Sequence, residues 1–498
     1  MIEPPPTYRS HNRDGAEQPA ALLTGIFFLL VLGALVTASY FRGAFTGDGF
    51  HYYSALRNFI DGYGAWEGPV FEHLFGNHAY LTLYLLAPAV GVFRSPLVLL
   101  YAGLFSWFIS AFVFYRFMRR LFAATNDPAG PTLSVALALA YLCHPLVLQC
   151  ALGYGKFLFQ PDCLLAPGLM LLAMAFFARN APATILSMLF IVWTKEEYIP
   201  LLPALFLWLL MSYRFLYGSV WPDRRHVLSI AVTYLAASAL SLAVLFFYRQ
   251  RNEYQHVSVN LHAPSLPVLP SLLVVSLLYL LPLAPFLMPV IGNRRTAIYF
   301  VGFTAALIAA RTLIDMVVYG SALSWLWGHT IIPPVLFITL AIALAQRAQE
   351  GALLLSARTL AYSIVLSAAI MTGLPALGGL NASSLSYHFG ILTGRQQIRP
   401  EYLRQIIEIS DALPEPQRLE TVMVPEHLMF PLMDRSHISI DWAIATRYYR
   451  KPTFVDNVSY LIIPKEGTAL RLFSDIIESS YILHHETEDF FVYRSTEL

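Results

Sequence analysis

Charged side chains are scarce in this sequence, and the charges that are present almost cancel. Asp, Glu, Lys and Arg make up 13% of its 498 residues, and the formal net charge is +1. Soluble domains carry roughly 25% charged residues, and proteins that bind nucleic acid carry a basic patch. The composition therefore argues against an ordinary soluble domain, and we expect no nucleic acid partner.

Cysteine is scarce as well. Cys143, Cys150 and Cys163 are the whole set, and each lies in or beside an apolar segment. Their spacing does not match that of a metal site, and a free Cys in such surroundings usually packs as a small hydrophobic residue. We therefore expect these residues to pack against their neighbours rather than to bind a metal.

Hydrophobic residues dominate instead. They make up 57% of the chain, and the mean hydropathy is +0.57. One globular core cannot hide this excess over such a length, so lipid must solvate it. Residues 1–20 are polar, whereas the apolar run 21–41 is long enough to cross a bilayer at about 1.5 Å per residue and too long for a cleaved signal peptide. We interpret it as the first membrane helix.

Further apolar runs predict a polytopic α-helical membrane protein with about eleven helices that cross the bilayer. The runs cover residues 96–117, 131–152, 163–177, 182–193, 199–216, 227–247, 266–291, 296–318, 331–345 and 353–372.

The segment 78–93 is apolar but short, and it contains Pro88 and Gly91. Cytoplasmic loops carry an excess of Lys and Arg, and the arginine clusters fall on one side only if this segment does not cross. We therefore predict a re-entrant or interface-lying segment on the outer face, with the N-terminus in the cytoplasm. The arginines are Arg116, Arg119, Arg120, Arg214, Arg224, Arg225, Arg294, Arg295, Arg347 and Arg358.

The character of the chain changes after about residue 374. Residues 400–413 have apolar positions at helical spacing, and 469–478 also read as a helix. Strands are predicted at 419–424, 458–463 and 490–493. Neither a Gly-rich phosphate loop nor a nucleophile elbow is present in this part.

These observations divide the chain into parts. Residues 1–20 are a cytoplasmic tail, and residues 21–374 are a transmembrane domain whose first outer loop covers 42–95. Residues 375–498 are a small extracytoplasmic α/β domain.

Asp48 is the first candidate functional residue, because it follows the first membrane helix and lies between Gly47 and Gly49. Glycine allows the tight turn that would bring the carboxylate to the membrane surface. There it could hold a divalent cation or take a proton from an attacking hydroxyl group. The alternative is an Asp that caps a surface helix. His78 lies further along the same loop, where a lone His is more often structural than a ligand.

Polar residues also crowd the next outer loops. Lys156, Gln160 and Asp162 lie between two apolar runs, and Lys156 could meet a phosphate as a point charge or reach the lipid headgroups. Lys195 and Glu196 form a charged cluster in a further loop. Lys195 could pair with Glu196 or bind an anionic substrate, and the alternative is a plain charged loop tip.

His329 precedes the apolar run 331–345, in which Pro333 and Pro334 lie about one turn in. We expect the two prolines to distort that helix. Freed backbone groups near a polar side chain often line a cavity rather than face lipid, so His329 is a further candidate.

The predicted topology gathers polar residues of several kinds on the outer face. A carboxylate, imidazoles and lysines together suit a lipid substrate that bears a phosphate, because lysine holds phosphate and a carboxylate acts on an acceptor hydroxyl or a metal. The residues are Asp48, His78, Lys156, Lys195 and His329.

The order of these features resembles a family of bacterial membrane proteins known as domain of unknown function 2079. The resemblance covers residues 41–494 and rests on the Asp48 loop and on several short motifs. The motifs are NHAYLTLYLLAPAVGVF at 77–93, YLCHPLVLQ at 141–149, FQPDCLLAPGLMLLAMAFF at 159–177, TKEEY at 194–198 and HTIIPPVLF at 329–337.

That family is similar in plan to membrane glycosyltransferases of the GT-C architecture. The resemblance implies a GT-C-like fold, a polyprenyl-phosphate donor and a site on the outer face of the bacterial cytoplasmic membrane. It also implies that Asp48 is the catalytic or metal-associated acid and that Lys195 contacts the donor phosphate. Mg²⁺ or Mn²⁺ is the cofactor that the resemblance allows for, although Gly49 follows Asp48 where the GT-C motif commonly has a second acid.

The leading hypothesis is therefore a transferase that moves a sugar from a polyprenyl-phosphate donor to an extracytoplasmic acceptor. Two alternatives stay open: a membrane transporter or lipid flippase, which would be expected to show inverted repeats, and a non-catalytic cell-envelope assembly protein. The predicted catalytic residues are Asp48, His78 and His329, and the predicted substrate-binding residues are Lys156, Gln160, Asp162, Lys195 and Glu196.

Overall fold

The computed structural model describes most of the chain. The described residues are 17–42, 48–62, 64, 79–123, 130–152, 158–218, 224–249, 268–319, 331–350, 362–363, 365–367, 369, 384–394, 399–414, 420–425, 437–441, 458–466 and 469–496.

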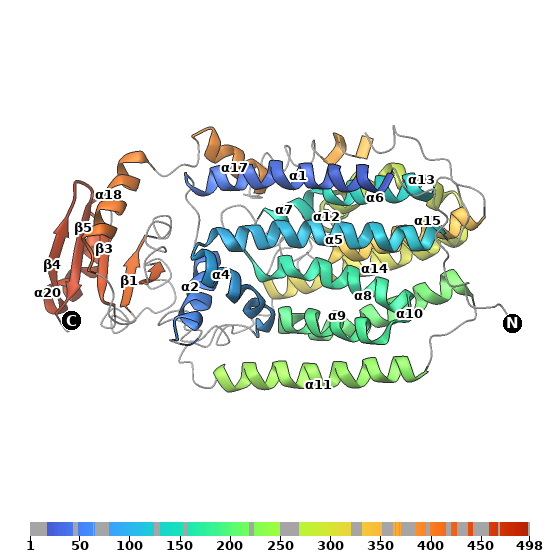
Figure 1. Ribbon diagram of the computed structural model, residues 1–498, viewed down its shortest axis with the longest axis horizontal. Coiled ribbons are helices and arrows are strands. Elements are labelled where there is room, and N and C mark those ends of the chain that lie inside the picture. Colours follow the sequence, from blue (N-terminus) through green and yellow to red (C-terminus); the bar gives the residue numbers. More distant parts are fainter. Residues whose placement is uncertain are drawn as a thin grey trace.

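Long apolar helices run side by side along the longest axis of the molecule (Figure 1). α1 (Glu17–Tyr40), α5 (Leu97–Ala123), α11 (Arg224–Arg249) and α14 (Arg294–Tyr319) have 24 to 27 residues each. At about 1.5 Å per residue, each can cross the hydrocarbon core of a bilayer. Large apolar side chains on their outer faces are exposed, such as Phe27 on α1, as expected for a surface that lipid solvates.

Shorter helices and 3₁₀ segments complete the bundle. Six helices are long and apolar enough to cross a membrane, or seven if one bent pair forms a single span, within the described residues. The predicted number of about eleven is therefore not established. The shorter elements are α2 (Asp48–Ile60), η1 (Leu81–Leu86), α4 (Ala87–Phe93), α6 (Gly130–Leu142), α7 (Pro145–Ala151), η3 (Pro161–Leu164), α8 (Leu165–Phe177), α9 (Ala181–Thr194), η4 (Glu196–Leu201), α10 (Leu202–Tyr217), α12 (Val268–Leu280), η5 (Leu281–Leu283), α13 (Ala284–Ile291), α15 (Ile332–Gln349) and α17 (Ser384–Leu392).

The bent pair is α6 and α7, which the sequence predicted as one continuous run. Their axes differ by 61°, and His144 at the break has an extended backbone. Pro145 causes the break, because the residue before a proline is pushed out of the helical region and proline itself is tolerated only in the first turn of the next helix. Pro282 similarly separates α12 from α13 by the 3₁₀ segment η5.

The segment made of η1 and α4 stays at one end of the bundle. α1 and α5 run antiparallel, since Gly25 faces Phe108 and Gly33 faces Tyr101. The chain therefore leaves α1 and enters α5 at the same end, and η1 and α4 lie at that end (Figure 1). This position agrees with the interpretation that the segment 78–93 does not cross.

α15 is the most enclosed helix among the candidate spans, with 89% of its apolar window buried. Its Phe337 packs edge-on against Phe114 of α5 at 5.8 Å and against Tyr141 of α6 at 5.1 Å between ring centroids. α5 and α6 therefore pack against α15, which is an enclosed apolar helix.

A five-stranded sheet forms the C-terminal part of the chain, in the order β2-β1-β3-β5-β4. β1 pairs in parallel with β2 and β3, and the pairs β3–β5 and β4–β5 are antiparallel. The predicted strands correspond to β1, β3 and β5, whereas the polar edge strands β2 and β4 were missed. The strands are β1 (Glu420–Val424), β2 (His437–Asp441), β3 (Tyr460–Pro464), β4 (Tyr481–Glu486) and β5 (Phe490–Ser495).

Helices cover both faces of this sheet. α18 (Pro400–Ala412) packs on one face, where Tyr402 meets Phe490 at 5.4 Å between ring centroids. α20 (Ala469–Ser480) packs on the other, where Phe473 belongs to an apolar cluster with Met423 and Leu461. Alternate residues of a strand point to opposite faces, so the domain has a three-layer α/β/α core.

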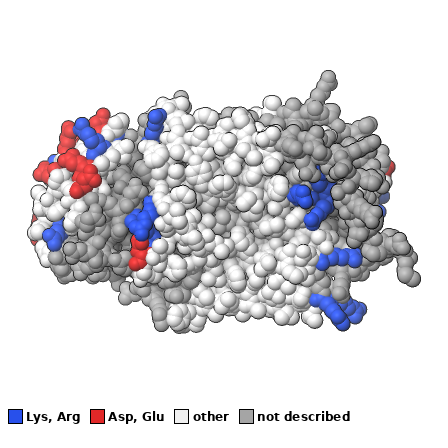
Figure 2. Space-filling view, in the orientation of Figure 1, with Lys and Arg blue, Asp and Glu red and all other residues white. Residues whose placement is uncertain are grey.

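The two ends of the molecule differ in charge. The C-terminal sheet lies at the end where α1 stops and α2 and α4 lie (Figure 1). Lys and Arg side chains gather at the opposite end (Figure 2), where Arg295 lies 3.4 Å from the carbonyl of Phe215 and Arg347 lies 3.0 Å from that of Pro289. Arginines near helix ends favour the cytoplasmic side, which predicts that the C-terminal domain lies outside.

Cysteine substitutions at exposed positions of the two ends test this orientation. We expect a membrane-impermeant maleimide to label Glu478→Cys, in α20, on intact spheroplasts, and to label Gly292→Cys, after α13, only once the membrane is broken. Both positions are exposed. The parent chain, which keeps Cys143, Cys150 and Cys163, gives the background. Labelling of Gly292→Cys on intact spheroplasts would reverse the predicted orientation.

Candidate functional site

Several predicted site residues fall where the structure gives no side chain. His78, Lys156 and His329 lie outside the described residues. Asp48 is the first residue of α2 and Glu196 the first residue of η4, and only the backbone is described at both positions.

Gln160, Asp162 and Lys195 are described in full, and all are buried. Their relative exposures are 4%, 3% and 7%. Charged residues are almost never this buried unless they are paired. The described part of the site therefore centres on Asp162 and Lys195.

Asp162 and Lys195 form a buried ion pair. The Lys195 Nζ lies 3.8 Å from Oδ2 of Asp162, and the Tyr198 hydroxyl donates a hydrogen bond to Oδ1. The partners considered from sequence, Glu196 and an anionic substrate, stay predictions, because the Glu196 side chain is not described. The described residues add Asp162 as a partner of Lys195, and η3, which carries Asp162, packs against α9.

Breaks in the helices bring these side chains together. α9 ends at Thr194, and Lys195 takes an extended conformation with φ −167° and ψ 135° before η4 begins. Within η4 the Tyr198 N–H donates to the Lys195 carbonyl at 3.1 Å, and residues three apart in a 3₁₀ segment lie on one side. In the other segment of the site, Pro161 is the first residue of the 3₁₀ segment η3, which carries Asp162.

Aromatic contacts join α2, which follows the first membrane helix, to this cluster. Tyr52 of α2 donates a hydrogen bond to the Tyr80 hydroxyl at 3.2 Å, and its ring lies edge-on to Phe159, which precedes Gln160, at 6.1 Å. Asp48 lies one helical turn before Tyr52 on α2. The helix that begins with Asp48 therefore packs against the same end of the bundle as the ion pair.

The segment η1 reaches the ion pair from another side. The Thr82 hydroxyl donates to Oγ1 of Thr194 at 3.4 Å, and Thr194 donates to the carbonyl of Phe190 at 2.7 Å. Thr194 is the residue before Lys195. The re-entrant segment predicted from sequence thus lies directly against the break that places the lysine.

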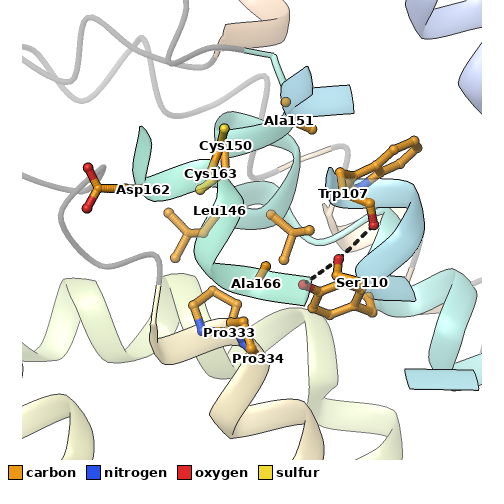
Figure 3. Close-up of a pocket in the computed structure, with 13 residues that line it drawn as sticks. Trp107, Ser110, Leu146, Cys150, Ala151, Asp162, Cys163, Ala166, Pro333 and Pro334 are labelled. Carbon is orange, nitrogen blue, oxygen red and sulfur yellow. Dashed lines mark hydrogen bonds between the residues drawn. The ribbon is translucent and has the colours of Figure 1, made fainter. Parts of the chain in front are cut away.

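A small cavity borders Asp162 on its inner side (Figure 3). Its volume of about 20 Å³ gives room for one water molecule. The Asp162 carboxylate points away from Ser110 (Figure 3).

Pro333 and Pro334 also line this cavity. α15 begins at Ile332, so these prolines occupy its first turn and do not distort it, contrary to the sequence prediction, because N–H groups there have no helical partner.

A large apolar groove is lined by residues close in sequence to the ion pair, although neither Asp162 nor Lys195 lines it. It has a volume of about 710 Å³ and lies between α4, α5, α8 and α9, with Tyr101, Phe105 and Phe190 among its walls. Leu164, two residues after Asp162, also lines it. A pocket of this size is typical of a site for a small molecule or part of a lipid chain.

The described residues do not form a metal site. No group of three or more His, Cys, Asp or Glu side chains that could hold an ion occurs among them. Asp162 already faces the ammonium group of Lys195, and a divalent cation at that carboxylate would be repelled by the lysine. The ion pair itself therefore offers no donor set for a divalent cation. The Mg²⁺ or Mn²⁺ predicted at Asp48 stays a prediction, because the structure does not describe that side chain.

Sequence reasoning missed some residues that complete the cluster. Neither Tyr198 nor Tyr52 was singled out from the sequence. The signal for Tyr198 is its position three residues after Lys195 in TKEEYIP, a spacing that matters only if the segment is 3₁₀. Thr82 carries no recognisable signal in the sequence.

The fold is shared with a solved membrane enzyme. None of the curated proteins matches the chain. Among solved structures, ArnT from Cupriavidus metallidurans in the apo state is similar with a TM-score of 0.54 and 14% sequence identity, over 95% of this chain and 98% of ArnT. ArnT is a GT-C glycosyltransferase, and the likeness shows a GT-C fold for this chain.

The family model described as a predicted membrane protein, domain of unknown function 2079, matches residues 45–393. The match includes Asp48, the ion pair of Asp162 and Lys195, and the groove. The chain therefore belongs to the domain of unknown function 2079 family of predicted membrane proteins, and its membrane domain has the architecture of a GT-C glycosyltransferase.

Proposed function

We propose that this chain is a membrane glycosyltransferase that moves a sugar from a polyprenyl-phosphate donor to an extracytoplasmic acceptor. The observation that carries the proposal is a buried lysine whose partner Asp162 lies two residues before Leu164, which lines a large apolar groove. A lipid phosphate needs this combination, because its chain needs an apolar surface and its headgroup needs a cation at the membrane boundary.

The groove suits the chain end of such a donor. Its walls are apolar side chains of α4, α5, α8 and α9. Leu164 in the wall lies two residues after Asp162, and Phe190 lies five residues before Lys195. Because lipid is as apolar as the groove, a prenyl chain would be held there by van der Waals packing and fit rather than by removal from water. The chain enters from the lipid, where the neighbouring helices already expose apolar faces.

Lys195 would hold the phosphate of the donor. Asp162 orients the ammonium group, while Tyr198 donates to the second carboxylate oxygen. A fixed positive charge in a site that excludes water stabilises the charge that develops on a leaving phosphate. Lys156, Gln160 and Glu196 complete the proposed substrate-binding set.

Asp48 would act as the base. In an inverting displacement the acceptor oxygen bonds to the anomeric carbon while the bond from that carbon to the phosphate oxygen breaks. The acceptor proton passes to the Asp48 carboxylate, and the polyprenyl phosphate leaves with the electron pair. His78 and His329 complete the proposed catalytic set, and the proposal also includes Mg²⁺ or Mn²⁺ at Asp48, although no step above depends on it.

Removing the charge of Lys195 tests the phosphate contact. We expect Lys195→Met to lower transfer about 100-fold or more, the effect of losing one strong electrostatic contact to a developing charge, and to purify without bound polyprenyl phosphate by mass spectrometry. Because a lone buried carboxylate destabilises the fold by about 3–5 kcal/mol, Lys195→Met alone could fail for structural reasons.

A double variant separates the two causes. Lys195→Met with Asp162→Leu removes both buried charges, so we expect its unfolding temperature to return toward that of the parent while lipid retention stays absent. Retention of polyprenyl phosphate by this folded double variant would remove Lys195 from the donor site.

Asp48→Asn tests the base. We expect it to lower transfer in membranes by about 10²- to 10⁴-fold, the range for loss of a general base, while bound polyprenyl phosphate is retained, because Lys195 and the groove are unchanged. Turnover like that of the parent chain would exclude Asp48 from the reaction.

Filling the groove tests the place of the lipid chain. Ala102→Phe puts a large ring into the groove wall, and we expect at least a tenfold higher KM for the donor. Gly302→Phe is the matched control, because it adds the same ring at an exposed α14 position with nothing within 4 Å of a Cβ. An equal effect of both variants would place the lipid chain elsewhere.

A further inference from the structure

His388 of α17 is a completely buried histidine that the proposed reaction does not use. Its Nδ1 lies 2.5 Å from the Ser39 hydroxyl in the last turn of α1. Its Nε2 lies 3.2 Å from the carbonyl of Leu152, the residue that caps the carboxyl end of α7. One ring therefore bridges the ends of two helices that are far apart in the sequence.

The ring is held in one protonation state. Burial lowers the pKa of His388 to about 4, although the hydrogen bond to Leu152 raises it in part, so the imidazole is neutral near pH 7. A carbonyl can only accept, so Nε2 carries the proton. Nδ1 shares a hydrogen bond with the Ser39 hydroxyl, which also lies 3.0 Å from the carbonyl of Val36. The last carbonyls of a helix have no partner within it, and His388 supplies one for Leu152.

Both bridged ends lead directly into the candidate site. Beyond Ser39, the chain continues from α1 to α2, which begins with Asp48. Beyond Leu152, it continues to Phe159 and to η3, which carries Asp162. The end of α7 is also packed closely against α5, since a Cβ at Gly103 would lie 3.2 Å from the Ala151 carbonyl.

We infer that His388 is a positioning residue that clamps the end of α1 to the end of α7 and so sets where α2 lies relative to the Asp162–Lys195 pair. This inference deepens the proposed function and rests on it for its effect on the reaction. A base and a leaving group must be placed to within a fraction of an ångström, so a loosened clamp slows the chemical step. Donor binding does not depend on the clamp, because Lys195 and the groove are held by other contacts.

The clamp also ties the C-terminal domain to the site. α17 precedes α18, the helix that packs on the C-terminal sheet. His388 therefore lies where the chain passes from the membrane bundle to that domain, and displacement of α17 would release both helix ends together.

Hydrogen–deuterium exchange of the full chain in detergent tests the clamp without any assay of activity. His388→Phe keeps a ring of similar size and removes both hydrogen bonds. We expect amides of residues 37–42 and 148–152 to exchange about tenfold faster, with other helices unchanged. Ser39→Ala and His388→Gln each remove the hydrogen bond between His388 and α1. We expect faster exchange of the amides of residues 37–42 alone in both variants. Phe389→Leu, at an exposed position of α17, is the matched control.

The kinetic readout is a fall in kcat of at least tenfold in His388→Phe with the retained polyprenyl phosphate unchanged, and partial recovery in His388→Gln. Unchanged exchange at both helix ends in His388→Phe would overturn the clamp, and so would faster exchange throughout the bundle. Local loosening with an unchanged kcat would limit His388 to a structural role and overturn the positioning claim. Local loosening in a chain that transfers no sugar would leave the clamp standing and overturn the proposed function instead.

Discussion

The ion pair between Lys195 and Asp162 determines how the end of the bundle is arranged. Both side chains are almost fully buried, and taking each charge out of water costs several kcal/mol unless the other is close. The break after α9 and the 3₁₀ segment η3 must therefore stay together, and Tyr198 must stay within reach of the carboxylate. The same requirement keeps the proposed phosphate contact, Lys195, close to η3, whose Leu164 lines the apolar groove.

Interrupted helices make such a pair possible in a membrane protein. Continuous helices satisfy their own backbone and present only side chains to lipid, whereas polar groups need irregular backbone that is enclosed by protein. Pro145, Pro161 and the extended Lys195 each interrupt a helix near this end of the bundle. α15, by contrast, accepts Pro333 and Pro334 in its first turn and continues as one helix that is enclosed by the core.

The two ends of the molecule are built for different surroundings. One end carries arginines that bond to carbonyls at helix ends, such as Arg347 to Pro289. The other carries short helices, the ion pair and the three-layer C-terminal domain. α17 connects these parts, and His388 places the connection against α1 and α7. The chemistry that we propose and the domain that follows it thus share one structural junction.

Local patterns in the sequence determined a good deal about this protein. Runs of apolar residues specify helices in lipid, because length and hydropathy act within one segment, and they identified the membrane class and most helices. Short apolar segments identified β1, β3 and β5, and short motifs identified the family. Proline positions were informative but ambiguous, since Pro145 breaks a helix whereas Pro333 begins one.

Only the tertiary structure decided which distant residues meet. The partner of Lys195 is Asp162 on another helix, and the partners of His388 are Ser39 and Leu152. No periodicity records such pairs, because they arise from the packing of whole helices against one another. For the same reason, Tyr198 and His388 look ordinary in the sequence, and their importance comes from burial beside groups that the chain brings together only when it folds.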